Sequence, residues 1–89
     1  MKKVIIEKYD VETKKVIMNI DTARALYYAI NGFEAGLFGA EDYIDEEDVA
    51  DYVIRNFLAD ESARELNTLG YESRIVFIKA VKEKIKELV

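Results

Sequence analysis

The chain has 89 residues, of which 13 are Lys or Arg and 18 are Asp or Glu, and it contains no Cys, His, Trp or Pro. The absence of Cys and His excludes a disulfide framework, a thiolate nucleophile, an imidazole base and the ordinary zinc or haem ligand sets. The length predicts one domain over residues 1–89 and excludes an enzyme with a cleft between two lobes. The net charge of −5 does not fit the basic footprint of a general nucleic-acid binder.

The first twenty residues alternate between apolar and polar side chains and predict an antiparallel β-hairpin. Residues 10–14 are the expected turn, because Asp10 can accept hydrogen bonds from the backbone that follows it. A register in which facing residue numbers add up to 24 places Tyr9 on the opposite face from the apolar side chains. That register gathers five of them on one face: Val4, Ile6, Val16, Met18 and Ile20.

Residues 21–89 have helical periodicity, and the first predicted helix starts with Asp21 or Thr22 as its N-cap. Its buried stripe is Leu26, Ile30, Phe33 and Leu37, and beside it runs a row of small residues, Ala25, Ala29, Gly32 and Gly36. The row allows close packing and is also compatible with a homodimer seam. We expect this helix to end near Gly36 to Gly39, since glycine is a poor helix former.

Three further helices are expected after this point. Asp45 and Asp48 form a predicted capping pair at the start of a helix that continues to about Leu58. Asp60 is the expected cap of a short helix that stops at Gly70, and the last helix runs from about residue 72 to residue 88. Residues 74–78 alone could form a strand, but the helical period continues through them. The fold class is therefore α+β, with an N-terminal antiparallel hairpin (1–20) packed against three to four helices (21–89).

The negative charge is concentrated in residues 41–61, which we call the acidic segment. It holds nine carboxylates and one Arg55, for a charge of −8. Carboxylates in the first turn of a helix are stabilised by its unpaired N–H groups, by about 0.3–1 kcal/mol each, so part of the segment has a purely structural explanation. Glu47 with Asp51, and Asp48 with Asp51, place like charges close together on one helix, which a basic partner surface would relieve.

In size and charge, this segment resembles the nucleic-acid mimics that phages and mobile elements encode against defence enzymes. The resemblance implies a non-enzymatic inhibitor that binds a basic protein surface, such as that of a CRISPR or restriction effector, and does not itself bind nucleic acid. Charge would raise the association rate, and apolar side chains would anchor the contact. The expected partner-binding residues are Glu41, Asp42, Tyr43, Asp45, Glu47, Asp48, Asp51, Tyr52, Ile54, Leu58, Asp60 and Glu61.

Two alternatives belong to other classes of protein. One is a helical dimerisation or adaptor module whose acidic face is only solvated. The other is a helix-turn-helix DNA binder over residues 66–76, in which Arg74, Lys79 and Lys82 would contact DNA, although Glu72 would repel phosphate.

Catalysis, metal binding and membrane insertion have little support in the sequence. Residues 39–51 lack the alternating oxygen ligands and central Gly of an EF-hand, and no pair of acid and base residues stands out. We therefore expect no catalytic, metal-binding or cofactor-binding residues. No apolar stretch is long enough for a membrane span, and Lys2 and Lys3 precede a strand-like run in place of a secretory signal, so we expect a cytoplasmic protein.

Overall fold

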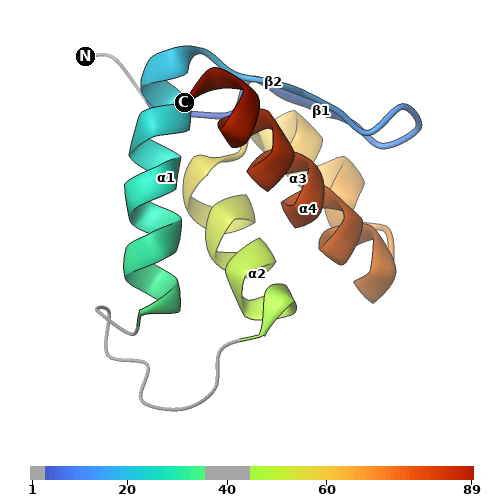
Figure 1. Cartoon of the computed structure of the whole chain (residues 1–89). Helices are drawn as coiled ribbons and strands as arrows, with labels where there is room; N and C mark the ends of the chain where they lie inside the picture. The colour runs from blue at the N-terminus through green and yellow to red at the C-terminus, as the bar shows by residue number, and fades with distance from the viewer. Residues whose placement is uncertain (1–3, 36–44) are drawn as a thin grey trace.

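The computed structural model describes residues 4–35 and 45–89. Within these ranges the order is β1 (Lys8–Asp10), β2 (Lys15–Ile17), α1 (Ile20–Glu34), α2 (Glu46–Phe57), α3 (Asp60–Asn67) and α4 (Tyr71–Leu88). The α+β fold, with an antiparallel N-terminal hairpin and helices packed against it, is confirmed. In Figure 1 the hairpin lies across one end of the helical layer, with α4 beside both α1 and α2.

The hairpin register differs by one residue from the predicted one. Tyr9 pairs with Val16 and Lys8 with Ile17, so facing numbers add up to 25. The turn sets this register, because Lys14 adopts a left-handed conformation (φ 62°) and donates its N–H to the Asp10 carbonyl at 2.7 Å. The shift turns Tyr9 inward, and its side chain is only 3% exposed.

The segment before β1 leaves the hairpin and pairs with the connection between α2 and α3. Ile6 forms a parallel bridge with Leu58, and the N–H of Ala59 donates to the Ile6 carbonyl at 3.1 Å. Of the five apolar side chains expected on one face, Ile6, Val16 and Met18 are buried, whereas Val4 and Ile20 are exposed. The period of two is interrupted because the chain changes pairing partner between Ile6 and β1.

Helix α1 starts two or three residues earlier than expected. Asn19 is its N-cap, and its side-chain oxygen accepts the N–H of Thr22 at 2.8 Å, so the assignment of Asp21 or Thr22 was wrong. Thr22 is instead buried, and its hydroxyl donates to the Ile5 carbonyl at 3.3 Å. The helix ends at Glu34, and the predicted end at Gly36 to Gly39, like Leu37, lies outside the described residues.

The two C-terminal helices agree with the sequence pattern except at their junction. Residues 74–78 are helical, and α4 buries Phe77, Ile78, Val81 and Ile85. Helix α3 begins at Asp60 with Ala59 as its N-cap, so Asp60 is the first helical residue and not the cap. Gly70 does not end α3 but is the N-cap of α4, with φ at −85°.

The core lies between the hairpin and the inner faces of the helices. Phe77 of α4 and Leu26 of α1 are fully buried in it. Tyr9 meets Phe77 edge-on, with ring centroids 4.9 Å apart and an interplanar angle of 77°. This contact joins the inward Tyr9 of β1 to the buried face of α4.

Candidate functional site

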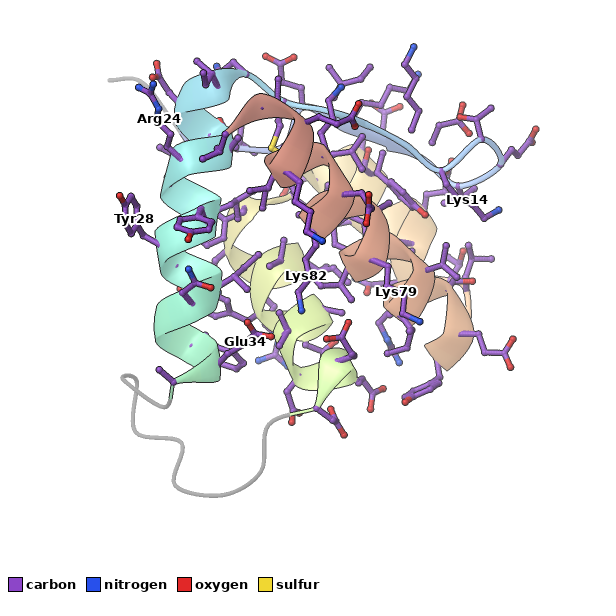
Figure 2. All side chains as sticks on the ribbon, viewed as in Figure 1. Lys14, Arg24, Tyr28, Glu34, Lys79 and Lys82 are labelled. Carbon is purple, nitrogen blue, oxygen red and sulfur yellow. The ribbon has the colours of Figure 1, made fainter. Side chains whose placement is uncertain are left out.

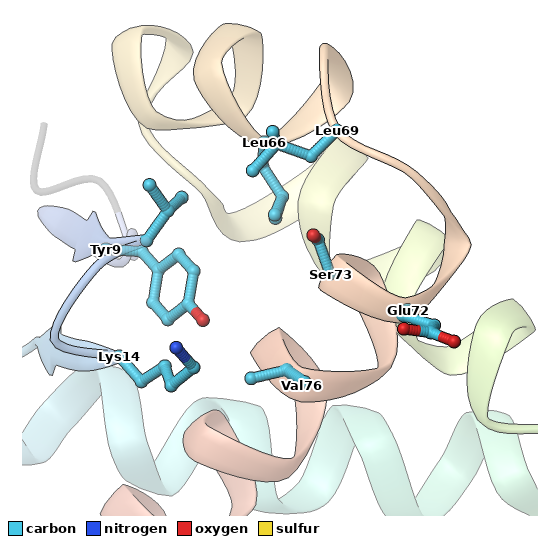
Figure 3. A pocket seen from close by; sticks show the side chains of 8 residues that line it. Tyr9, Lys14, Leu66, Leu69, Glu72, Ser73 and Val76 are labelled. Atoms are coloured by element: carbon cyan, nitrogen blue, oxygen red, sulfur yellow. The ribbon is translucent and has the colours of Figure 1, made fainter.

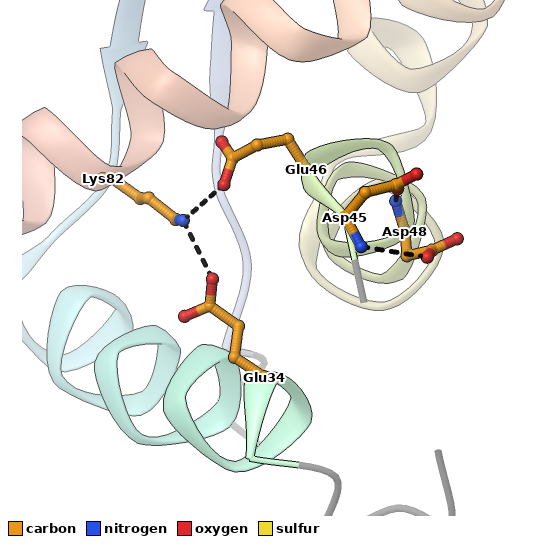
Figure 4. A network of polar contacts seen from close by, with 5 residues as sticks. All are labelled: Glu34, Asp45, Glu46, Asp48 and Lys82. Carbon is orange, nitrogen blue, oxygen red and sulfur yellow. Dashed lines mark hydrogen bonds and ion pairs between the residues drawn. The ribbon is translucent and has the colours of Figure 1, made fainter. Parts of the chain in front are cut away.

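The first turn of α2 has the predicted capping box. The Asp45 carboxylate accepts the N–H of Asp48 at 3.0 Å, and the Asp48 carboxylate accepts the N–H of Asp45 at 3.3 Å (Figure 4). These two carboxylates therefore accept hydrogen bonds from backbone N–H groups at the start of the helix. This is the purely structural role that carboxylates in a first helical turn can have.

Two other carboxylates of α2 are paired with Arg74 of α4. An Arg74 Nη atom lies 3.4 Å from Glu47 Oε2, and Arg74 Nε lies 3.9 Å from Asp51 Oδ1. The second distance is short enough for an ion pair but too long for a hydrogen bond. Arg74 Nε is accordingly buried without a hydrogen-bond partner in the described part of the chain. The like charges of Glu47 and Asp51 are thus compensated within the fold.

Lys82 of α4 joins three helices. Its ammonium lies 2.9 Å from Glu46 Oε1 at the start of α2 and 3.0 Å from Glu34 Oε2 at the end of α1 (Figures 2 and 4). Burial of the ammonium lowers the pKa of Lys82, but the hydrogen bonds and charges of Glu46 and Glu34 outweigh this and hold its pKa above the ordinary value. The carboxylates of α2 that face α4 therefore stabilise the packing of these helices through ion pairs.

The apolar anchors expected on the surface lie elsewhere. Ile54 and Leu58 are each 5% exposed and belong to the core, so their assignment as partner-binding side chains was wrong. Helix α2 is covered by both α1 and α4, which widens its buried face to include Ile54, and Leu58 faces inward where it bridges Ile6. Tyr52 is half-buried and stacks on Phe33 of α1, with centroids 4.5 Å apart.

Of the remaining expected residues, Asp60 and Glu61 lie within the described part of the chain, and they do not form one surface with the first turn of α2. Asp60 and Glu61 are exposed in the first turn of α3, whereas Glu41, Asp42 and Tyr43 lie outside the described residues. The start of α3 is separated from the start of α2 by the length of α2, which is about 18 Å for twelve residues. The described part of the acidic segment, residues 45–61, is therefore divided into two regions.

A groove between β1 and α3 is lined by carboxylates that have no partner elsewhere in the described part of the chain. Glu61 and Glu65 of α3 and Glu7 beside β1 line a hollow of about 180 Å³, which we call the acidic groove. All three side chains are exposed, and none has a side-chain hydrogen bond or ion pair to the rest of the described chain. Lys8 also lines the groove, which leaves an excess of two negative charges.

The walls of the acidic groove are held together by backbone contacts. The N–H of Tyr9 donates to the buried Ser62 Oγ at 3.2 Å, and the bridge between Ile6 and Leu58 joins the same two segments of the chain. Glu7 and Glu65 are not among the partner-binding residues expected from the sequence. Glu65 could have been found from its spacing of four from Glu61, but the placement of Glu7 depends on a bridge between distant segments.

Within residues 4–35 and 45–89, no three carboxylates are arranged to hold a metal ion. The same ranges contain no helix with the length and apolarity that crossing a membrane requires.

The helix-turn-helix alternative loses two of its three expected DNA contacts. Arg74 and Lys82 are both engaged by carboxylates of the same chain, and only Lys79 is exposed. Their charges are neutralised internally, whereas phosphate binding requires free cations.

Comparison with known proteins adds no family to this description. No protein-family model, curated protein sequence or solved structure matches the chain significantly.

Proposed function

We propose that this chain is a small non-enzymatic interaction protein that binds a basic surface of another protein through the acidic groove. The observation that carries the proposal is that Glu7, Glu61 and Glu65 stay exposed and unpaired within the described residues, while the carboxylates of α2 nearest α4 have internal partners. Charge that the fold does not use for its own packing is available to a partner.

The chemistry of the groove favours an Arg-rich or Lys-rich partner segment. Glu61 and Glu65 are one helical turn apart, which places two acceptors about 6 Å apart along α3. A guanidinium group can donate two parallel hydrogen bonds to the two oxygens of one carboxylate, so each of these two glutamates binds an arginine better than a lysine. Lys8 at the edge would disfavour cations at one end of the groove and so help to orient the partner.

The narrower form of this proposal is a cytoplasmic inhibitor, encoded by a phage or mobile element, that mimics nucleic acid against a CRISPR or restriction effector. It adds one requirement, namely that the bound surface is the effector's own nucleic-acid channel. Duplex DNA or guide RNA must then compete with the protein for the effector, and the effector's cleavage activity must fall when the protein is added.

The test measures binding to a fluorescent arginine-rich peptide and to purified nucleases at low and high salt. A Glu61→Gln/Glu65→Gln double variant should bind about ten-fold more weakly, and the affinity of the wild type should fall steeply with salt. Glu83→Gln/Glu87→Gln is the matched control, because it removes the same two charges at the same spacing from the exposed side of α4. Equal losses in the two double variants would refute the role of the acidic groove.

A second candidate is a dimerisation or adaptor module, and the outer face of α1 favours it. Ile20, Tyr27 and Tyr28 are 44%, 45% and 73% exposed, and only three of the fifteen residues of α1 are charged. Tyrosine is enriched in protein interfaces, whereas Lys and Glu are depleted. Sedimentation of the wild type and a Tyr28→Arg variant tests self-association: a dimer that this change dissociates would support the module, and a monomer at all concentrations would exclude a homodimer.

A further inference from the structure

A second pocket opens between the turn of the hairpin and the junction of α3 and α4 (Figure 3). Its volume is about 210 Å³, and we call it the hairpin pocket. Its apolar lining comes from the hairpin turn, the end of α3 and the second turn of α4: Val11, Leu66, Leu69 and Val76. Leu69 and Val76 are 39% and 36% exposed, so apolar surface remains uncovered at the mouth.

Tyr9 brings an unpaired hydroxyl into this pocket. Its side chain is 3% exposed, and its ring is fixed edge-on against Phe77. In Figure 3 the hydroxyl points from the ring into the open space, and no group in the described ranges makes a hydrogen bond to it. Burial, followed by the charge of Asp10, raises the pKa of Tyr9, so the hydroxyl keeps its proton and can donate it.

Lys14 supplies a cation at the same place. Lys14 closes the hairpin turn in a left-handed backbone conformation, which residues other than Gly, Asn and Asp seldom adopt. Its N–H is held by the Asp10 carbonyl, and Asp10 also accepts the N–H groups of Glu12 and Thr13 at 2.9 and 3.3 Å. The only hydrogen bond of the ammonium in the described chain is to the Glu12 carbonyl at 3.5 Å, so the ammonium retains free donor capacity.

The third polar group on the inside is Ser73. Ser73 lines the pocket, and its hydroxyl points toward Leu66 in Figure 3. Glu72 also lines the pocket, but its carboxylate points away from Tyr9 and Lys14. The groups that face the interior are thus one ammonium and two hydroxyls above an apolar floor.

We propose that the hairpin pocket binds a carboxylate attached to a short apolar group. The ammonium of Lys14 and the hydroxyls of Tyr9 and Ser73 donate to the carboxylate, and the apolar group lies against Leu69 and Val76. The volume is below the roughly 300 Å³ at which pockets for drug-sized ligands begin, which limits the apolar group to the size of one aliphatic side chain. Two kinds of ligand have a carboxylate attached to a short apolar group: a free aliphatic acid and the C-terminal residue of a peptide. The proposal does not rest on the acidic groove, whose lining shares only Tyr9 with the hairpin pocket.

The test is an NMR titration of the full chain with hexanoate and, separately, with hexanamide, which has the same shape without the charge. Hexanoate should shift the signals of Tyr9, Lys14, Ser73 and Val76 with a dissociation constant of about 1 mM. Hexanamide should bind about ten-fold more weakly, because it lacks the charge that pairs with the ammonium.

A peptide with a C-terminal Leu, in free-acid and amidated forms, separates the two sources. Tighter binding of the free-acid peptide than of hexanoate identifies a peptide C-terminus as the natural ligand. Binding of hexanoate without the peptide identifies a small acid, and either result supports the shared chemistry.

Variants decide whether the named groups are responsible. Lys14→Met keeps the length and the backbone strain of the side chain but removes its charge, and should weaken hexanoate about ten-fold. Lys15→Met is the matched control, since it removes the same charge from the next residue, which does not line the pocket, and it should leave binding unchanged. Tyr9→Phe keeps the ring against Phe77, removes the hydroxyl and should weaken binding about five-fold.

The proposal is overturned if hexanoate causes no shifts at the pocket, if hexanamide binds equally well, or if Lys14→Met and Lys15→Met have the same effect. Each variant is first compared with the wild type by its backbone NMR spectrum. Because Lys14→Met changes an exposed side chain, a loss of binding in a chain with an unchanged spectrum is a loss of the site itself.

Discussion

The ammonium of Lys82 lies 2.9 Å from the carboxylate of Glu46, which ties the middle of α4 to the first turn of α2. The same ammonium also binds Glu34, the last residue of α1. One side chain therefore connects the helices on both sides of residues 36–44 to the C-terminal helix. Lys82→Met should lower the free energy of unfolding by about 1 kcal/mol, a modest value because all three side chains are about one-third exposed and solvent screens them.

Thermal denaturation measures this loss as a decrease in Tm of about 4–8 °C. Lys79→Met is the control on the same helix, since Lys79 is exposed and makes no ion pair among the described residues. A similar decrease in both variants would show that the contacts of Lys82 are not the cause.

The pKa of Lys82 gives this contact a defined pH dependence. Because the folded chain holds that pKa above its ordinary value of 10.5, the stabilisation is complete below pH 10.5 and is lost as the pH rises through the raised pKa. The difference in unfolding free energy between the wild type and Lys82→Met should therefore be constant near neutrality and shrink in alkaline solution. Urea denaturation at a series of pH values measures it, and a difference that grows with pH would contradict the assignment.

Tyr9 and Phe77 make a second prediction, because each packs against the other in the core. Tyr9→Ala should cost about 3–5 kcal/mol, as for other buried aromatic side chains, whereas Tyr28→Ala on the exposed face of α1 should change stability by less than about 0.5 kcal/mol. A double-mutant cycle with Phe77→Leu should give a coupling of about 0.5–1.5 kcal/mol. Additive losses in urea denaturation would mean that the edge-on contact contributes nothing specific.

Asn19 makes a third prediction, at the start of α1. Asn19→Ala removes the acceptor of the Thr22 N–H and should lower stability by about 1 kcal/mol. Asn31→Ala is the matched control, because it replaces an exposed Asn within the same helix, where Ala is the better helix former. Circular dichroism during thermal denaturation should show a lower Tm for the first variant and an equal or higher Tm for the second.

These cases show which parts of the fold are readable from the sequence. The helices and the capping box of Asp45 and Asp48 were correct because they depend on neighbours within four residues. The hairpin register was wrong by one residue because the left-handed Lys14 carries no sequence signal, unlike a Gly at the same place. The burial of Ile54 was missed because a helical wheel does not show that α2 has helices on two sides.

The candidate site was less predictable than the fold, because its contacts join residues that lie far apart in the sequence. The partners of Glu47 and Glu46 are Arg74 and Lys82, which lie 27 and 36 residues farther along the chain. Local charge patterning detects the row of carboxylates but not the cations that compensate it. Some of the carboxylates that the pattern indicated as surface charge instead pair with α4 and stabilise the packing of the helices. The exposed carboxylates of the acidic groove include Glu7, which lies far from the acidic segment in the sequence.

Gly70 makes a fourth prediction, and here the expected effect is stabilising. It is the N-cap of α4 with an ordinary φ of −85° and no side-chain cap, and a Cβ at this position would meet no atom within 4 Å. Gly70→Ser should raise stability by about 0.5–1 kcal/mol, by adding a hydroxyl acceptor and restricting the unfolded chain. Gly70→Ala separates the two effects, since it restricts the unfolded chain but supplies no acceptor. Urea denaturation in which Ser is no better than Ala would exclude a capping contribution.

The carboxylate of Asp10 makes the last prediction, because it organises the turn that positions Lys14. Hydrogen bonds from the backbone N–H of Glu12 and then of Thr13 hold the pKa of Asp10 below its ordinary value of 3.8. The depressed pKa means that Asp10 stabilises the turn fully above pH 3.8, and that this stabilisation is lost as the pH falls through the lower, folded value. An NMR titration of the Asp10 carboxyl carbon should have its midpoint below that of a peptide spanning residues 8–16. The amide signals of Glu12 and Thr13 should titrate with the same midpoint, since those N–H groups lose a charged acceptor.

In Asp10→Asn the side-chain oxygen remains but the titration disappears, so both amide signals should be independent of acid pH. Unchanged titration of these amides in the variant would show that another carboxylate controls the turn.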